Sequence, residues 1–250
     1  MKTMKKTTNK PTKTQVFNVI ILDRSGSMES IRTAAIDGFN ETLAGIKKAQ
    51  ERYVKTQKHY VSLLTFCDCE KKYVFDKVPA GMARKLTLED YKPCCCTPLY
   101  DAMGFTLTSM RNHVAAIPDH VVVVTIITDG LENASKEYTG AAVKQLVEEL
   151  KKEGWTFTYM GANQNSVDVA FNLSIRNSRD FIACPQGMLT TMFKDTNTRM
   201  NFFGKLNEKK EEECRAWCIP GMLTPKITPE ERAAAYSAMA DAAFDEEENK

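Results

Sequence analysis

The feature that most constrains the fold is an alternation of short apolar runs with longer segments of helical periodicity. The runs at residues 16–22, 60–66 and 120–128 are largely continuous, which is typical of strands buried on both faces. After the first run, apolar residues recur at helical spacing over residues 31–46. Strands separated by helices predict a mainly parallel sheet covered on both faces, so we expect a doubly wound α/β fold.

The remaining elements extend this pattern and add one exception to the parallel arrangement. Only a few residues separate the second run from the next, at residues 72–78, which predicts a hairpin and one antiparallel edge strand. Thr97 and Pro98 are typical of an N-cap and a first helical position, so a helix is expected up to residue 113. Further helices are expected at residues 143–150 and 165–172, and further strands at residues 155–159 and 181–183.

The alternation weakens near residue 185, which suggests how the chain is organised. Residues 1–15 are lysine-rich and are expected to form a disordered basic tail before an α/β domain at residues 16–185. Residues 186–219 are expected to be a helical extension. Residues 220–250 combine a linker rich in proline, a short alanine-rich helix and an acidic tail at residues 245–248.

Composition argues against a nucleic-acid or membrane partner. The 250 residues carry a net charge of +2, which gives no excess of basic side chains for binding nucleic acid. The most apolar stretch, residues 121–127, is too short to span a bilayer. The first fifteen residues lack the apolar segment of a secretory signal, so we expect a cytoplasmic protein whose eight cysteines are reduced.

Oxygen-bearing side chains follow two of the predicted strands. Asp23, Ser25 and Ser27 come after the first strand at a spacing of two, which points them to one side of an extended loop. Gly26 lets this loop turn sharply, and Asp129 follows the valine-rich strand. Ligands bind at the carboxyl ends of strands in doubly wound sheets, so both groups should lie together. Carboxylate and hydroxyl oxygens suit Mg²⁺, Mn²⁺ or Ca²⁺ and are poor ligands for zinc.

The Asp-x-Ser-x-Ser motif of Asp23, Ser25 and Ser27 resembles the metal-ion-dependent adhesion site (MIDAS) of von Willebrand factor A (vWA) domains. In that family, a threonine from a later loop and an aspartate after the fourth strand complete the site. Thr97 and Asp129 stand at these positions in the same order, and the resemblance covers about two-thirds of the chain. It implies that the three hydroxyls contact the metal directly, and that the two carboxylates do so directly or through water.

The resemblance also implies a function. In the family, an Asp or Glu side chain of a partner protein completes the coordination of the metal, and intracellular relatives in bacteria and phages work as adaptors. We therefore expect a non-enzymatic, metal-dependent protein-binding module with Mg²⁺, or else Mn²⁺ or Ca²⁺, as its cofactor. Candidate partner contacts around the metal are Gly26, Met28, Glu132, Asn163 and Gln164. The sequence identifies neither the partner nor the oligomeric state.

Cysteines stand where vWA domains of this kind often have small residues such as glycine or serine. Cys94, Cys95 and Cys96 directly precede Thr97. Small side chains in a reducing compartment are the simplest interpretation, and redox sensitivity or affinity for soft metals is the alternative. The remaining cysteines, among them Cys67 and Cys69, do not show the spacing of a zinc site as a set.

Three other interpretations compete with a metal-dependent adhesion site. Asp23 and Ser25 could cap a helix that begins near residue 29, but this leaves Thr97 and Asp129 unexplained. Asp23 could accept a phosphoryl group in an Mg²⁺-dependent phosphohydrolase, although Ser25 stands where such enzymes generally place a second acid. A metal-free scaffold is the third alternative, but all five ligand positions are filled. The chain has no Gly-x-Ser-x-Gly motif and no Gly-Lys-Ser/Thr phosphate loop.

Overall fold

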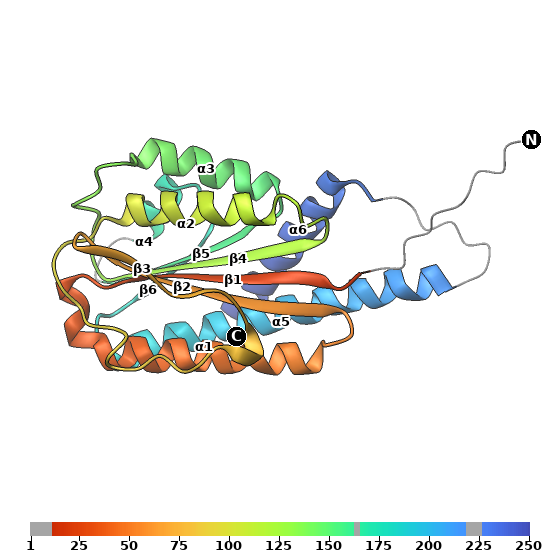
Figure 1. Cartoon of the computed structure of the whole chain (residues 1–250), viewed down its shortest axis with the longest axis horizontal. Helices are drawn as coiled ribbons and strands as arrows, with labels where there is room; N and C mark the ends of the chain where they lie inside the picture. Colours follow the sequence, from red (N-terminus) through yellow and green to blue (C-terminus); the bar gives the residue numbers. More distant parts are fainter. Residues whose placement is uncertain (1–11, 163–165, 219–226) are drawn as a thin grey trace, which may run out of the picture.

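One mixed sheet organises the computed structural model, which describes residues 12–162, 166–218 and 227–250 (Figure 1). Its six strands lie in the order β3-β2-β1-β4-β5-β6. They are β1 (Thr14–Asp23), β2 (Gln57–Cys67), β3 (Glu70–Pro79), β4 (His120–Thr128), β5 (Thr156–Ala162) and β6 (Asn177–Phe181). Neighbouring strands are parallel except β2 and β3, which form the hairpin at one edge. The doubly wound α/β fold with one antiparallel edge strand is therefore confirmed.

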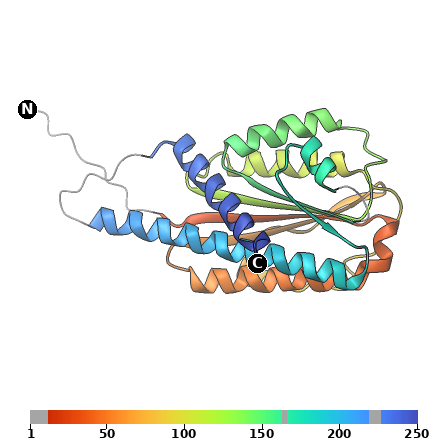
Figure 2. The same ribbon diagram turned by 180° about the vertical axis from the view of Figure 1, so that it is seen from behind.

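Helices cover both faces of this sheet (Figures 1 and 2). The first face carries α1 (Arg32–Arg52) and α5 (Pro185–Cys218), and the other carries α2 (Leu99–Val114), α3 (Gly140–Lys152) and α4 (Ser166–Asn172). The last helix, α6 (Pro229–Glu248), contacts both α3 and α5. Two short 3₁₀ helices are η1 (Gly26–Ile31) and η2 (Ala80–Met82). No helix in the described ranges combines the length and apolarity that crossing a bilayer requires.

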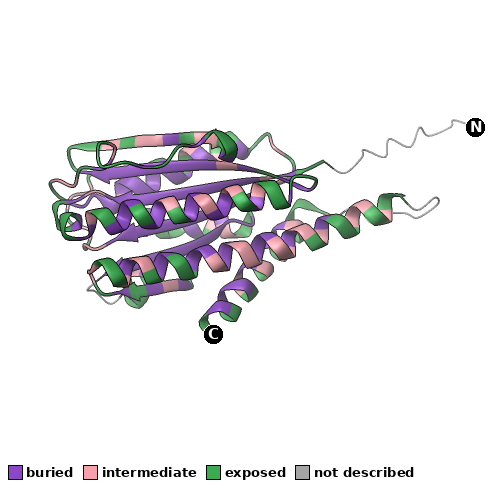
Figure 3. Cartoon of the chain, turned by 90° about the horizontal axis from the view of Figure 1, so that it is seen from below, coloured by how far each residue is buried: buried purple, intermediate pink, exposed green. Residues whose placement is uncertain are grey.

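The core forms on both sides of the central strands, as their continuous apolar runs predict. In β4, every residue after His120 is buried, because its alternate side chains face helices on opposite sides of the sheet. Val122 and Val124 pack towards α2 and α3, whereas Ile127 packs towards α1. Buried positions accordingly fill the central strands, while exposed positions lie on the outer sides of the helices and along the edge strand β3 (Figure 3).

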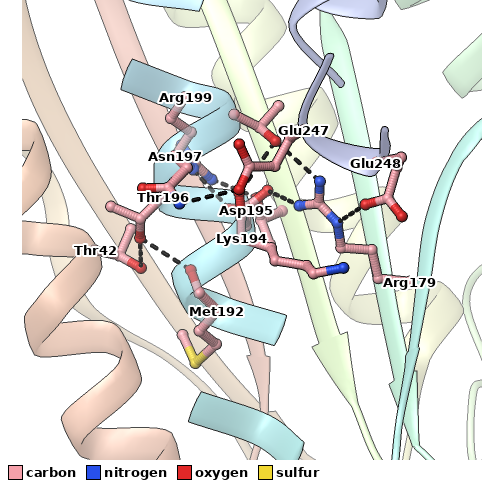
Figure 4. Close-up of polar contacts among 12 residues, drawn as sticks. Thr42, Arg179, Met192, Lys194, Asp195, Thr196, Asn197, Arg199, Glu247 and Glu248 are labelled. Atoms are coloured by element: carbon pink, nitrogen blue, oxygen red, sulfur yellow. Dashed lines mark hydrogen bonds and ion pairs between the residues drawn. The ribbon is translucent and has the colours of Figure 1, made fainter. Parts of the chain in front are cut away.

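Buried polar contacts fasten α5 to the sheet (Figure 4). Arg199 donates to Asp195 at 2.8 Å and to Asn18 of β1 at 3.2 Å. Thr125 of β4 donates to Asp195 at 3.3 Å, and Arg179 of β6 lies 3.8 Å from the same carboxyl group. Because the charged partners are almost wholly buried, each depends on the others for its solvation. The predicted helical extension thus contributes to the same core as the predicted domain.

Several boundaries differ from the sequence expectation. β1 begins at Thr14, within the predicted tail, because the backbone there pairs with β2. Pro98 is the residue before helix α2 and has a non-helical backbone, so the predicted N-cap role of Thr97 is wrong. β6 spans Asn177–Phe181 instead of residues 181–183. The helix expected at residues 186–219 corresponds to α5, which runs without a break from Pro185 to Cys218.

The acidic end of the chain is helical, which corrects the expectation of a solvated tail. Asp245 pairs with Arg176, and Glu248 pairs with Arg179, each at 2.9 Å. Glu247 is buried and accepts a hydrogen bond from Asn197 of α5. These partners on other elements neutralise the run of like charges, so the helix persists to its end. The predicted linker lies mostly outside the described residues, as do residues 1–11 of the predicted basic tail.

Candidate metal centre

The predicted ligands gather at the carboxyl ends of β1 and β4, towards the left of Figure 1. The register pairs Leu22 with Ile127, so Asp23 and Thr128 end neighbouring strands side by side. From β1 the chain continues to opposite sides of this strand, to β2 first and later to β4. Strand order therefore reverses between β1 and β4, and this is the place where doubly wound sheets bind ligands.

Four of the five predicted ligands form one hydrogen-bonded chain. Asp23 Oδ1 accepts the backbone N–H of Ser25 at 2.7 Å. The Oγ atoms of Ser25 and Ser27 lie 3.1 Å apart, and Ser27 Oγ donates to Asp129 Oδ1 at 2.5 Å. The spacing of two in the first loop does place the two hydroxyls side by side. Asp129 approaches them from β4, 102 residues further along the chain.

Thr97 faces the same group of oxygens, as the position of Gly130 makes clear. A Cβ atom built on Gly130 would lie 3.1 Å from Thr97 Oγ1, 3.8 Å from Ser27 Oγ and 3.9 Å from Asp23 Oδ2. Oxygens from two separate segments therefore lie within 4 Å of one point beside Gly130, which belongs to a third segment. The absence of a side chain at Gly130 leaves that point open. The structure thus brings all five predicted side chains together.

Backbone hydrogen bonds from two loops hold Thr97 in place. The N–H of Thr97 donates to Asn133 Oδ1 at 2.8 Å, and the N–H of Asn133 donates to the carbonyl of Thr97 at 3.2 Å. Asp101 accepts the amides of Lys136, Glu137 and Tyr138, so it ties α2 to the loop after β4. Burial raises the pKa of Asp101, but these amides outweigh it and hold the value below its usual range. The threonine is thereby fixed relative to the end of β4.

The site concentrates negative charge without a basic partner. Asp23 is fully buried, and this burial raises its pKa to about 6 despite the hydrogen bonds from Thr128 and Ser25. Burial likewise raises the pKa of Asp129. Among the described residues, no lysine or arginine pairs with either carboxyl group. The guanidinium of Arg24 contacts Cys67 and Glu70 instead. A bound cation is the charge that would offset two such carboxylates.

Sequence reasoning missed two residues that position Asp23. Thr128 Oγ1 donates to Asp23 Oδ2 at 2.6 Å, and the hydroxyl of Tyr91 donates to the Asp23 carbonyl at 2.5 Å. Thr128 could have been suspected, because it is a hydroxyl residue at the end of a largely apolar strand, directly before Asp129. Tyr91 lies in the irregular segment between η2 and α2, where no pattern marks it.

The predicted partner contacts differ in whether they are free to contact another protein. Gly26 is exposed beside the oxygens. Met28 is wrong as a contact, because it is fully buried in the core against α1. Glu132 is also a poor contact, because its carboxylate accepts hydrogen bonds from Tyr100, Ala134 and Ser135 within the protein. Asn163 and Gln164 lie outside the described residues.

Comparison with known proteins identifies relatives by structure alone. No family model and no curated protein sequence matches the chain. The open conformation of the pilus adhesin SpaC from Lactobacillus rhamnosus GG superposes with a TM-score of 0.56 at 14% identity, covering 76% of this chain and 30% of SpaC. The VWA domain of SpRpn10 gives a TM-score of 0.47 at 11% identity, covering 72% of this chain and 94% of that domain.

A further structure, proximal thread matrix protein 1 from the mussel byssus, has a zinc-occupied MIDAS motif. It gives a TM-score of 0.48 at 14% identity and covers 75% of this chain and 46% of that one. The chain thus spans less than a third of SpaC and under half of the byssus protein. At these identities, the likeness establishes a fold and no more. The chain has an α/β, Rossmann-like fold that superposes on part of SpaC.

Proposed function

We propose that this chain is a metal-dependent protein-binding module. A divalent cation at the candidate metal centre would be held by Asp23, Ser25, Ser27, Thr97 and Asp129. The observation that carries the proposal is the convergence of oxygens from three distant segments beside two acids that no basic side chain in the described part of the chain neutralises. A structural role alone would leave this negative charge uncompensated.

The donor set favours a hard cation. All five side chains offer oxygen, which suits Mg²⁺ and leaves Mn²⁺ and Ca²⁺ as alternatives. Only two of the five donors are carboxylates, so a divalent ion held by them retains affinity for another anion. Mg²⁺ commonly keeps solvent ligands that an incoming group can displace. An Asp or Glu side chain of a partner protein fits this position, and Gly26 and Ser27 are exposed there.

Phosphoryl transfer is the enzymatic alternative, and the environment of Asp23 disfavours it. Its Oδ1 accepts the Ser25 amide, its Oδ2 accepts the Thr128 hydroxyl, and the side chain is fully buried. A nucleophilic carboxylate needs a free oxygen aimed at the phosphorus atom. We therefore propose a binding function without catalysis, in a cytoplasmic adaptor of the bacterial or phage type. The metal-free scaffold remains the alternative that the following experiment excludes.

Isothermal titration calorimetry with Mg²⁺ and Mn²⁺ tests the metal centre. The wild-type chain should bind one equivalent, whereas Asp23→Ala should give no saturable heat. Asp37→Ala, an exposed acid on α1, is the matched control and should bind like the wild type. Equal heats for the wild type and Asp23→Ala would overturn the proposal.

The binding function needs a test of its own. Proteins captured by the wild-type chain in Mg²⁺ should be released by chelator and should not be retained by Asp23→Ala. Substituting acidic residues of the captured protein should then locate the one that completes the coordination. A partner that remains bound in chelator would show that the metal is not the contact.

A further inference from the structure

Four cysteine thiols gather beside the candidate metal centre, although they come from two separate loops. Cys67 ends β2 and Cys69 lies in the turn that follows, whereas Cys94 and Cys95 belong to the loop before α2. The sulfurs of Cys67 and Cys94 lie 3.5 Å apart, and those of Cys69 and Cys95 lie 2.9 Å apart. All four are free thiols.

The spacing of these sulfurs suits a tetrahedral thiolate site. The sulfurs of Cys67, Cys69 and Cys94 all lie within 4.8 Å of one another. Sulfurs bound to one Zn²⁺ at about 2.3 Å stand roughly 3.8 Å apart in a tetrahedron. Small changes of side-chain rotamer would therefore bring three thiolates onto one ion. Cys95, in contact with Cys69, is placed to supply a fourth ligand.

The two loops are fastened to each other, so the thiols stay together. The amide of Cys96 donates to Asp68 Oδ1 at 2.9 Å, and the amide of Asp68 donates back to the carbonyl of Cys96 at 3.2 Å. Cys95 has a φ of 62°, a left-handed conformation that costs a residue with a side chain about 1 kcal/mol. The fold maintains this unfavourable backbone at the point where the Cys95 thiol meets Cys69.

The positively charged side chain of Arg24 also lies beside these thiols. Arg24 Nη2 lies 3.3 Å from the sulfur of Cys67 and 3.1 Å from Glu70. Three or four thiolates around a divalent ion carry a net negative charge, and a neighbouring guanidinium offsets it. The donors are chemically distinct from those of the oxygen site, so the two sites select different ions. Thiolates prefer zinc-like ions, and carboxylates with hydroxyls prefer magnesium-like ions.

We propose that Cys67, Cys69 and Cys94, with Cys95 as the fourth ligand, form a second metal site for a thiophilic divalent ion such as Zn²⁺. On binding, each thiol loses its proton to solvent, and the ion joins the β2–β3 turn to the loop before α2. This loop leads directly into Thr97, and its Cys94 amide donates to the carbonyl of Arg24 at 2.8 Å. An ion bound there would stiffen the loop after β1 and the loop before α2, which carry ligands of the candidate metal centre. The thiol site does not depend on the proposed function.

Co²⁺ titration of the reduced, metal-free chain tests this site, because tetrahedral thiolate coordination gives cobalt an intense visible absorption and a sulfur-to-metal charge-transfer band. One equivalent of Co²⁺ should produce both bands, and Zn²⁺ should displace it. Asp23→Ala, which removes the oxygen site, should leave the bands unchanged. Cys69→Ser and Cys94→Ser should each reduce Zn²⁺ affinity at least tenfold, as measured with a chromophoric chelator.

The variant Cys218→Ser removes an exposed thiol at the end of α5 and is the matched control, which should retain both bands. Circular dichroism establishes that each serine variant is folded. The proposal is overturned if the wild-type chain shows no charge-transfer band. It is equally overturned if the bands persist in Cys69→Ser and Cys94→Ser, or if Asp23→Ala abolishes them.

Discussion

Replacing Asp23 by asparagine separates the charge of this residue from its hydrogen bonds. Asp23 Oδ1 accepts the Ser25 amide, and an asparagine oxygen can do the same. Its NH₂ group would donate to Thr128 Oγ1, whose own hydroxyl can turn to the Gly130 carbonyl at 3.0 Å. The substitution therefore preserves every hydrogen bond and removes only the buried charge.

The expected gain in stability follows from the pKa. Burial raises the pKa of Asp23 from 3.8 to about 6, and each unit corresponds to about 1.4 kcal/mol, so the charge costs about 3 kcal/mol at neutral pH. A raised carboxyl pKa penalises folding wherever the group is ionised in the unfolded chain, because folding must then either take up a proton or bury the charge. The penalty is absent below about pH 4, develops between pH 4 and 6, and is complete at pH 7.5. In chelator at pH 7.5, the variant should thus be more stable by up to about 3 kcal/mol.

Urea denaturation at pH 7.5 and pH 4, both in chelator, measures this difference. The advantage of Asp23→Asn should be present at the higher pH and vanish at the lower. Added Mn²⁺ should stabilise the wild type but not the variant. An unchanged difference between the two pH values would refute the reasoning, as would a loss of stability in the variant at pH 7.5.

Asp119→Asn is the matched control, because it makes the same change at a buried carboxylate that has partners. Asp119 contacts Lys210 at 2.6 Å and Tyr236 at 3.1 Å. Removing its charge leaves the buried Lys210 with Glu213 as its remaining carboxylate partner, so stability should fall by about 2 kcal/mol at pH 7.5. If Asp23→Asn raises the stability and Asp119→Asn lowers it, then the presence of a basic partner, and not burial alone, decides the effect of removing a buried charge.

Three further predictions concern the metal centre and the core. Because Asp23 must be ionised to bind a cation, Mn²⁺ affinity measured by calorimetry should fall about tenfold per pH unit below pH 6, and a flat profile would contradict this. Gly130→Ala should weaken Mn²⁺ binding about tenfold or more, since its Cβ would lie 3.1 Å from Thr97 Oγ1, and undiminished affinity would place the ion elsewhere. Arg199→Met should lower the free energy of unfolding by about 3 kcal/mol, because it leaves the buried Asp195 short of a partner; a change under 1 kcal/mol would argue against that role.

The fold class could be predicted from the sequence because its signals are local. Continuous apolar runs such as that of β4 and the helical spacing after β1 each report their own element, and their alternation limits the topology to few arrangements. The motif at Asp23, Ser25 and Ser27 could also be predicted, because residues at a spacing of two point to the same side of an extended loop. Thr97 was identified through the resemblance to the vWA motif, and Asp129 through that resemblance and its place after a predicted strand.

Contacts between distant segments could not be read in this way. The positions of Thr128 and Tyr91 against Asp23 depend on strand register and on an irregular loop, and neither produces a periodic pattern in the sequence. The acidic end of the chain reads as solvated until Arg176 and Arg179 are seen beside it. Local patterns in the sequence were sufficient to predict the strands, the helices and the oxygen-bearing loop after β1. The folded arrangement sets which charges are paired and which thiols meet, because these interaction energies depend on separation in space and not along the chain.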